Sequence, residues 1–339
     1  MPASPRCPRA TDRARSDPPH AVLVYSGAHA VLSYSMRIGL TGGGSSTGRI
    51  VAQAQQAEAD GFSALWYASE VCGDPLVAMA LAGAQTTTIE LGTAVLQTYP
   101  CHPLLQAKRI ASVVDAIGRP GFTLGIGPSH EPLIRGVYGL SYEHPGRNTE
   151  EYLRIITALL RGQDVDFDGD DWSVHTQGRG VKPQQRVPVL LAALGPRLLR
   201  VAGELADGVV LWMASTRAIA THVVPKLHAA AAAARRQAPR VVAGLPVAVH
   251  DDEAEARAAA AATSGMYSGM TNYQRILAIG GAADPAEAAV VGDEASVRAQ
   301  LQSLLDAGAT DIWAAVFPVG EDKRTSMRRT IDLLRELVS

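Results

Sequence analysis

The segment Val187–Trp212 contains the residues best suited to hold an anion. A buried apolar strand leads into Gly195, and a helix is expected to begin at Pro196, since Pro favours the first helical position. The N–H groups of a first helical turn lack partners within the helix, and the helix dipole places partial positive charge there. A phosphate group binds well at such a place, and Arg197 would add a full charge. Ordinary helix capping is the alternative explanation.

Two other glycine-containing loops are candidates for contact with a flat ligand. Gly125 and Gly127 end a strand-like run and precede His130, whose imidazole titrates near neutral pH. Glycines at a strand end let a ring lie against the backbone, although a plain tight turn is the alternative. The run is not a dinucleotide-binding fingerprint, because His130 stands where a third Gly is needed. Thr41–Gly48 lacks the Lys of a P-loop, and a flexible turn is its alternative interpretation.

Strands and helices alternate along the chain from Met36 onward. Short apolar or β-branched runs are each followed by a turn and by a segment with helical periodicity. The expected strands are Arg37–Leu40, Ala64–Tyr67, Glu90–Val95, Phe122–Ile126, Val189–Ala192, Gly208–Trp212, Val241–Val249 and Asp311–Val316. The expected helices are Arg49–Asp60, Asp74–Ala84, Pro103–Ala116, Asn148–Leu160, Pro196–Leu205, Arg217–Gln237, Glu253–Ala262 and Lys323–Val338.

This alternation predicts the α/β class and a (β/α)8 TIM barrel with insertions in its βα loops. Right-handed parallel crossovers close a barrel when there are eight units, and an open doubly wound sheet is the structural alternative. The expected insertions are Gly127–Pro188, with a hairpin at Asp166–Trp172, and His250–Thr310, with helices at Ser268–Ile279 and Asp293–Asp306. Active sites of barrels lie on these loops, so long insertions predict a substrate larger than a simple sugar or alcohol.

Composition excludes several classes of protein. The 339 residues are 47% apolar and 19% charged, with a formal net charge of −2 and no basic stripe for nucleic acid. No apolar run reaches the roughly 18 residues of a membrane span, and no cluster has metal-ligand spacing. Cys7, Cys72 and Cys101 fit no disulfide or zinc pattern, which favours a reducing cytoplasm. Residues 1–35 are expected to be a disordered extension or an over-long start, before one domain at 36–339.

Several motifs in a fixed order resemble the luciferase-like monooxygenase superfamily and, within it, the F420-dependent oxidoreductase branch of actinomycetes. The resemblance covers residues 36–339, and the series of motifs is more specific than any one of them. The motifs are LGTAVLQTYPCHPLLQAKR, GFTLGIGPSHEPLIRGVYGLSYEHP, EEYLRIITALLRGQDVDFDGDDW, AALGP, AGELADGVVLW and VVGDEASVRAQLQSLLDAGATDIWAAVF.

The resemblance implies a set of cofactor and substrate positions. Ala94 and Val95 match a bulge in the third strand, where relatives carry a non-proline cis peptide behind the central ring of the cofactor. Gly127 and Ser129, together with His130, match residues that border the cofactor. The implied phosphate cradle is Ala193, Leu194, Gly195 and Pro196, and the implied substrate side is Tyr99, Trp212 and Met213, with packing as the alternative for Tyr99.

The resemblance also implies catalytic candidates, although this chain departs from the pattern. Glu70 matches an acidic position near the reactive ring, but Val71-Cys72 follow it where many relatives have His, and Leu133 stands where some have Asn. The proton-transfer partner is therefore expected to be His130 or His102. Each has a structural alternative: acceptance of backbone N–H bonds for Glu70, a helix start for His102 and loop packing for His130.

By this resemblance the chain is expected to be an oxidoreductase in which coenzyme F420 exchanges a hydride at C5 with a small-molecule or peptide-like substrate. The expected reaction is reduction of an activated C=C or C=N bond or oxidation of an alcohol. A monooxygenase that uses reduced FMN and O2 is the alternative, and a non-catalytic ligand-binding barrel is the third class. Relatives often dimerise through helices of the first half, so a homodimer is expected, with no nucleic-acid or membrane partner.

Overall fold

The computed structural model describes residues 21–26 and 29–339, with side chains from Ser35 onward. Two units are distinguished, Met1–Ser35 and Met36–Ser339. In the first unit, β1 (Ala21–Ser26) pairs antiparallel with β2 (His29–Tyr34). The expected extension at 1–35 lies largely outside the described residues and stays a prediction.

The second unit is a closed barrel of eight parallel strands, which confirms the predicted fold class. The strand order follows the chain, and the barrel closes because the last strand pairs with the first and the fourth pairs with the fifth. The eight strands are β3 (Ile38–Gly42), β4 (Ala64–Tyr67), β5 (Glu90–Thr93), β7 (Phe122–Gly127), β10 (Val189–Ala192), β11 (Gly208–Trp212), β12 (Arg240–Val249) and β14 (Asp311–Val316).

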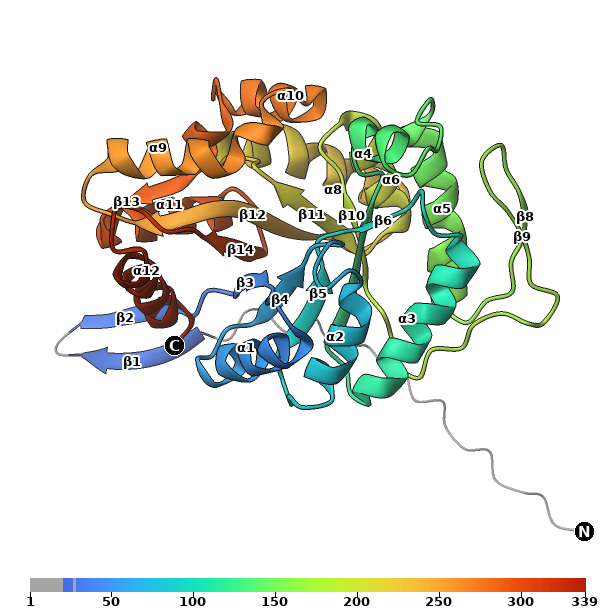
Figure 1. The fold of residues 1–339 in the computed structure, drawn as a ribbon, viewed down its shortest axis with the longest axis horizontal. Helices are drawn as coiled ribbons and strands as arrows, with labels where there is room; N and C mark the ends of the chain where they lie inside the picture. The colour runs from blue at the N-terminus through green and yellow to red at the C-terminus, as the bar shows by residue number, and fades with distance from the viewer. Residues whose placement is uncertain (1–20, 27–28) are drawn as a thin grey trace, which may run out of the picture. The chain divides into compact units, whose positions relative to one another are not determined.

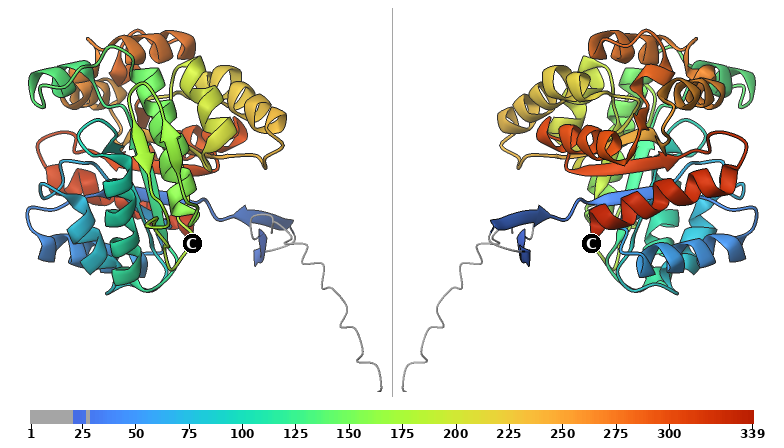
Figure 2. Two further views of the ribbon diagram at one scale, coloured as in Figure 1. Left: turned by 90° about the vertical axis from the view of Figure 1, so that its right-hand side faces the viewer. Right: turned by 90° about the vertical axis from the view of Figure 1, so that its left-hand side faces the viewer.

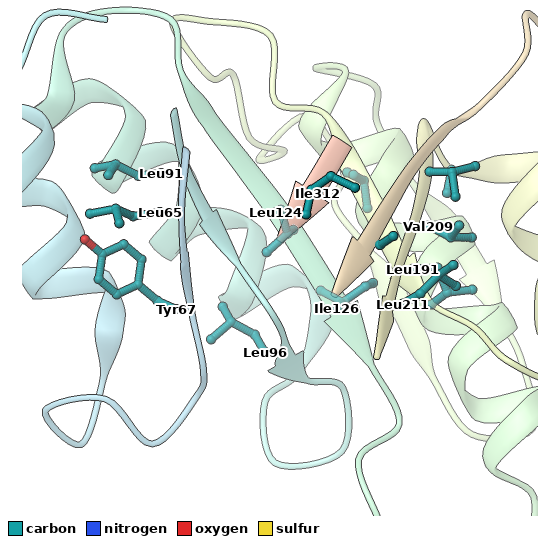
Figure 3. Close-up of a cluster of buried hydrophobic side chains, with 14 of the residues drawn as sticks. Leu65, Tyr67, Leu91, Leu96, Leu124, Ile126, Leu191, Val209, Leu211 and Ile312 are labelled. Atoms are coloured by element: carbon teal, nitrogen blue, oxygen red, sulfur yellow. The ribbon is translucent and has the colours of Figure 1, made fainter. Parts of the chain in front are cut away.

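Helices flank the barrel, as Figures 1 and 2 show. Several begin at Pro or at a capping Asp, such as Asp74, whose carboxylate accepts from the N–H of Leu76 at 3.0 Å. Apolar side chains of the strands face these helices and form the main core (Figure 3). The helices are α1 (Thr47–Ala59), α2 (Pro75–Gly83), α3 (Pro103–Ile117), α5 (Pro145–Leu160), α6 (Pro196–Leu205), α8 (Val224–Ala233), α11 (Glu294–Asp306) and α12 (Lys323–Val338).

The predicted single helix Arg217–Gln237 is interrupted. It consists of α7 (Thr216–Ala218), one turn of π-helix, η1 (Ile219–Val223), and α8. Pro225 lies in the first turn of α8 and has no N–H to donate, so the regular α-helical ladder cannot continue through it. The sequence expectation of one continuous helix was therefore wrong at this point.

Two insertions follow β7 and β12, as predicted. The first contains α4 (Glu131–Gly136) and the expected hairpin, β8 (Asp166–Asp168) with β9 (Ser173–His175). The second contains α9 (Glu253–Ser264), η2 (Gly265–Tyr267), α10 (Thr271–Gly280), η3 (Pro285–Ala288) and β13 (Val290–Gly292). In Figure 1, α10 lies near α4, so the two insertions meet.

The interior of the barrel is filled by side chains rather than left open. Trp66 and Trp313 are buried there among small and β-branched residues. A Cβ at Gly92 would lie 2.3 Å from the Trp66 ring, and one at Gly244 would lie 2.3 Å from the Trp313 ring. These glycines are therefore required by the two indoles, which close the barrel below its mouth.

Charged residues form the floor of the barrel, at the starts of the strands. Arg240 Nη1 lies 2.7 Å from Glu90 Oε1, and Arg240 Nη2 lies 2.7 Å from Asp311 Oδ1. Arg37 reaches the same two carboxylates. These four side chains balance one another's charge, and barrel active sites lie at the opposite end, where the strands finish.

Candidate active site

A bulge interrupts the third barrel strand at the mouth. The strand stops at Thr93 rather than at Val95 as predicted, and β6 (Leu96–Gln97) resumes the pairing with β7. The expected non-proline cis peptide is present between Ala94 and Val95. Thr93 replaces the missing ladder contact, because its Oγ1 lies 2.8 Å from the N atom and 2.7 Å from the O atom of Gly125.

Gly125 and Gly127 serve this bulge, which corrects the reason given for them. A Cβ at Gly125 would lie 1.9 Å from the carbonyl oxygen of Thr93. A Cβ at Gly127 would lie 2.9 Å from Cβ of Ala192 and 3.2 Å from Cγ2 of Val95. Neighbouring protein atoms thus require glycine at both positions, whether or not a ring lies against them. Val95, Gly127 and Ala192 form one continuous surface at the mouth.

The expected phosphate cradle is open and uncapped. No atom lies within 4 Å of the place where a Cβ on Gly195 would stand, and α6 has no side-chain cap. The first-turn N–H groups of α6, at Arg197 and Leu198, therefore point out of the helix and have no acceptor among the described residues. Arg197 itself pairs with Glu150, its Nη2 lying 3.2 Å from Oε2. An anion here would be held mainly by backbone N–H groups.

His222 supports this cradle from behind and was missed by sequence reasoning. Its Nε2 lies 2.9 Å from the carbonyl oxygen of Leu194. A carbonyl oxygen only accepts, so Nε2 carries the proton and donates. The residue lies in η1, inside an Ala-rich helical segment that gives no sign of a functional histidine.

Aromatic rings from three segments gather over the mouth. Trp212, at the end of β11, stacks on Trp313 with centroids 4.8 Å apart and contacts Tyr267 at 6.2 Å. His130 contacts Tyr267 at 6.5 Å and Tyr273, in α10, at 5.7 Å. His130 and Trp212, predicted from separate motifs, are therefore connected through Tyr267. The sequence analysis did not identify either tyrosine, since their places depend on how the second insertion folds back.

Met213 does not share this position with Trp212. Its backbone has a positive φ of 60°, and its side chain is 0% exposed in the main core. Met213 follows β11, whose last residue is Trp212, and it packs in the main core, whereas Trp212 packs against the cluster of Trp66 and Trp313 inside the barrel. The expectation that Met213 faces the substrate is not supported by this placement.

His102 and His130 differ in what their rings do. His102 Nδ1 accepts from the N–H of Leu104 at 3.3 Å, so Nε2 carries the proton, 3.3 Å from the carbonyl oxygen of Ser173. Both nitrogens thus hold the start of α3 and the hairpin. The His130 ring makes aromatic contacts instead, and burial lowers its pKa, which favours the neutral imidazole. No hydrogen bond of the His130 ring to the described residues is found, in contrast to His102.

The remaining predicted residues lie around these features. Glu70 is exposed after β4, with Ser69 Oγ 3.4 Å from its carboxylate. Tyr99 stacks on Tyr142 with centroids 5.2 Å apart, and the Tyr142 hydroxyl donates to the carbonyl oxygen of Ser129 at 2.8 Å. Burial, with the nearby charge of Asp171, raises the pKa of Tyr99 to about 12. Tyr99 thus packs on Tyr142, which reaches Ser129, and Glu70 makes no contact with the aromatic cluster among the described residues.

Two further expectations concern the described residues as a whole. Residues 21–26 and 29–339 contain no group of His, Cys, Asp and Glu arranged to hold a metal ion. No helix in that same part of the chain has the length and apolarity needed to cross a membrane.

Comparison with known families and proteins gives consistent matches. The family model described as luciferase-like monooxygenase matches residues 30–323. A 5,10-methylenetetrahydromethanopterin reductase of Archaeoglobus fulgidus is 30% identical over 156 residues, 46% of this chain and 46% of that protein. An F420-dependent hydroxymycolic acid dehydrogenase of Mycobacterium tuberculosis is 31% identical over 230 residues, 63% of this chain and 62% of that protein. The chain spans about half of the first relative and less than two thirds of the second.

Solved structures share the fold. An F420-dependent secondary alcohol dehydrogenase, in complex with an F420-acetone adduct, superposes with a TM-score of 0.74 at 16% identity, covering 90% of this chain and 99% of that one. The oxygenating constituent of the 3,6-diketocamphane monooxygenase of Pseudomonas putida, in complex with FMN, gives 0.69 at 16% identity, covering 90% and 98%. At such identities the likeness shows the barrel and does not discriminate between the two cofactors.

Proposed function

The chain belongs to the luciferase-like monooxygenase family, and on that premise we propose that it is an oxidoreductase that uses coenzyme F420. When bound, the deazaflavin supplies a carbon, C5, that gives or takes a hydride from an organic substrate. The name of the mycobacterial relative, an F420-dependent dehydrogenase, supports this choice. The substrate class stays open between an activated C=C or C=N bond and an alcohol.

The observation that carries the proposal is the uncapped start of α6 beside open space at Gly195. A cofactor phosphate would be held by backbone N–H groups at Leu194, Gly195 and the first turn after Pro196, with Ala193 behind them. The ring system would lie toward Ala94, Val95, Gly127 and Ser129, at the bulge. We propose that these residues, which the family resemblance implied, contact the cofactor.

The chain's own side chains would position the substrate and move a proton. Trp212, Tyr267 and Tyr273 supply apolar walls that exclude water from the mouth. His130 lies against these walls as a neutral imidazole and can accept or return the proton that accompanies hydride transfer. Glu70 is exposed and lies apart from the rings, so we rank it below His130 as a proton-transfer residue. We assign no proton transfer to His102, whose two ring nitrogens are engaged.

Cofactor choice is the experiment that tests the proposal. The purified protein is titrated separately with F420 and with FMN, and binding is followed by fluorescence. We expect F420 to bind and the substitution Gly195→Ala to weaken it, with the fold intact. Tight capture of FMN without binding of F420 would overturn the proposal.

The second candidate is an FMN-dependent monooxygenase, favoured by the description of the family itself. Nitrogen at ring position 5 of FMN permits oxygen activation, whereas carbon at that position does not. Substrate turnover that requires oxygen and reduced FMN would identify this candidate. Binding of either cofactor without any turnover, unchanged by His130→Gln, would instead identify a ligand-binding barrel.

We also propose a homodimer, formed through α2 and α3. Val77, Leu81 and Leu105 are 63%, 46% and 54% exposed on these helices, where large apolar side chains are costly to leave in water. A shallow groove of about 400 Å³ lies between the helices and is lined mainly by apolar residues such as Leu76 and Val113. Leu81→Glu should shift the sedimentation of the protein toward monomer, while Met327→Glu on α12 should not. A wild-type monomer would overturn this assignment.

The location of the protein stays a proposal as well. Cys72 and Cys101 are free thiols, and free thiols suit a reducing compartment such as the cytoplasm.

A further inference from the structure

A cavity of about 820 Å³ lies at the end of the barrel opposite the candidate active site. Its lining includes Val187, Asp207 and Pro239, which lie one or two positions before the starts of β10, β11 and β12. The candidate active site lies where the strands finish. The cavity is therefore a separate place on the molecule, and its occupant does not depend on the proposed function.

This cavity is lined by four cationic side chains and by only one carboxylate among the described residues. The cations are Arg161, Lys182, Arg186 and Arg236, and the carboxylate belongs to Asp207. Arg186 Nη2 lies 3.0 Å from Asp207 Oδ1, and Arg236 Nη2 lies 3.9 Å from the same atom. Arg161 and Lys182 pair with no carboxylate of residues 35–339. One negative charge is thus shared by two arginines, and two cations are left without a counter-charge.

Helix ends account for part of this positive charge. Arg161 Nη2 donates to the carbonyl oxygen of Leu205 at 3.4 Å, and Arg236 Nη2 donates to that of Ala206 at 2.6 Å. A helix C-terminus carries roughly half a negative charge. The ends of α5, α6 and α8 at this cavity, even together with Asp207, do not neutralise four cations.

The geometry of Arg236 shows that the positive charge is unbalanced. Its Nε is buried and has no hydrogen-bond partner in the part of the chain that the structure describes, which is costly for a charged donor. Burial, followed by the nearby charge of Arg161, lowers the pKa of Arg236, and Arg186 acts in the same direction. Guanidinium groups that repel one another around an open cavity are stabilised when an anion enters.

We propose that this cavity binds a small multivalent anion, one that carries two or more phosphate or carboxylate groups. Arginine binds such groups through two parallel hydrogen bonds, and Lys182 adds a mobile point charge at the rim. A single charge would leave part of the cluster unpaired, whereas two or more match the excess.

Calorimetric titration with inorganic pyrophosphate and with citrate, at low ionic strength, tests the site. The double substitution Arg161→Gln and Lys182→Gln removes the two unpaired, exposed cations, and we expect it to weaken binding about tenfold or more. Asp207→Asn removes the competing carboxylate and keeps its acceptor oxygen, so it should strengthen binding. Arg298→Gln, on another surface and paired with Glu336, is the matched control and should change nothing.

Each outcome decides for or against the site. Binding of both anions supports recognition by charge, and binding of pyrophosphate alone supports a phosphate ligand. Unsaturable binding, binding that the double variant leaves unchanged, or binding weakened by Asp207→Asn overturns the proposal. Because α6 would also accept phosphate, a signal abolished by Gly195→Ala and kept by the double variant belongs to the active site and likewise overturns it.

Discussion

The Nε2 atom of His222 lies 2.9 Å from the carbonyl oxygen of Leu194, 28 positions earlier in the chain. This hydrogen bond joins a π-helical turn to the loop that begins α6, just before Gly195. Since the carbonyl oxygen accepts, it cannot turn toward an anion at the start of the helix. His222 is therefore a positioning residue for the proposed phosphate cradle.

Loss of this bond should weaken cofactor binding more than it disturbs the fold. His222→Ala leaves a partly buried carbonyl without its donor, at a cost of about 1–3 kcal/mol. We expect the Kd for F420 to rise about tenfold, measured by fluorescence titration, with a modest fall in Tm. His228→Ala, on the same helical segment, is the control and should leave the Kd unchanged. An unchanged Kd for His222→Ala would remove its positioning role.

Two glycine substitutions should affect different properties, the stability of the fold in one case and the affinity for F420 in the other. Gly125→Ala places a Cβ 1.9 Å from the carbonyl oxygen of Thr93, a backbone atom that cannot move aside. It should lower the free energy of unfolding by about 3 kcal/mol or more. Gly195→Ala meets no atom within 4 Å, so its stability should stay within about 0.5 kcal/mol of wild type while its F420 affinity falls. Urea unfolding and ligand titration separate the two effects.

His130 should control the acid limb of the pH profile. Burial lowers its pKa below the ordinary value of 6.5, so its neutral form persists to lower pH than that of a free histidine. The rate of turnover should fall only when the pH drops below this lowered pKa, because the imidazole is then protonated. His130→Gln should lower kcat by about 100-fold and remove this limb, whereas His102→Gln should keep it. A retained limb in His130→Gln would assign the proton to another group.

Glu58 should contribute a pH-dependent part of the stability. Its Oε1 accepts from the N–H groups of Thr87, Thr88 and Ile89 at 2.8, 2.5 and 3.0 Å. Burial opposes ionisation, yet these bonds together lower the pKa of Glu58 from 4.5 to about 2. Because the folded pKa is the lower one, the contribution is complete above about pH 4.5 and is lost as the pH falls toward 2.

The substitution Glu58→Gln isolates this contribution. It should lower the free energy of unfolding by about 1–2 kcal/mol at pH 7 and flatten its decline below pH 4.5. Urea unfolding at several pH values measures both effects. Glu143→Gln, at an exposed position, should reproduce the wild-type pH dependence. An identical decline in Glu58→Gln and wild type would contradict the assignment.

Local sequence signals predicted much of the barrel. Strands such as Ala64–Tyr67 and Val189–Ala192 and the helix Pro196–Leu205 have the predicted bounds, because apolar runs, prolines and capping residues act over a few neighbouring positions. The prediction at Val95 was less complete. The bulge itself was anticipated by resemblance, but the Thr93 hydroxyl that bridges it to Gly125 was not.

The candidate site was predictable to the extent that its residues follow the ends of strands. His130, Trp212 and Gly195 were placed at the mouth because parallel strands of a barrel end on one side. Tyr267 and Tyr273 could not be placed, since the path of the insertion at 250–310 depends on its own packing. His102 remained a candidate in the sequence because its bond to Ser173 joins it to a hairpin about 70 positions away, a contact that no local pattern shows.

The amino-acid sequence by itself determined the alternation of strands and helices, and with it the barrel, since hydrophobic period and turn residues are local properties. It also determined where α6 begins, since Pro196 after Gly195 suits the first helical position. The tertiary structure alone decided that His102 binds the hairpin, that Trp212 packs against Trp313 and which cations share Asp207. These outcomes depend on contacts between distant segments, whose distances and burial arise only when the barrel closes.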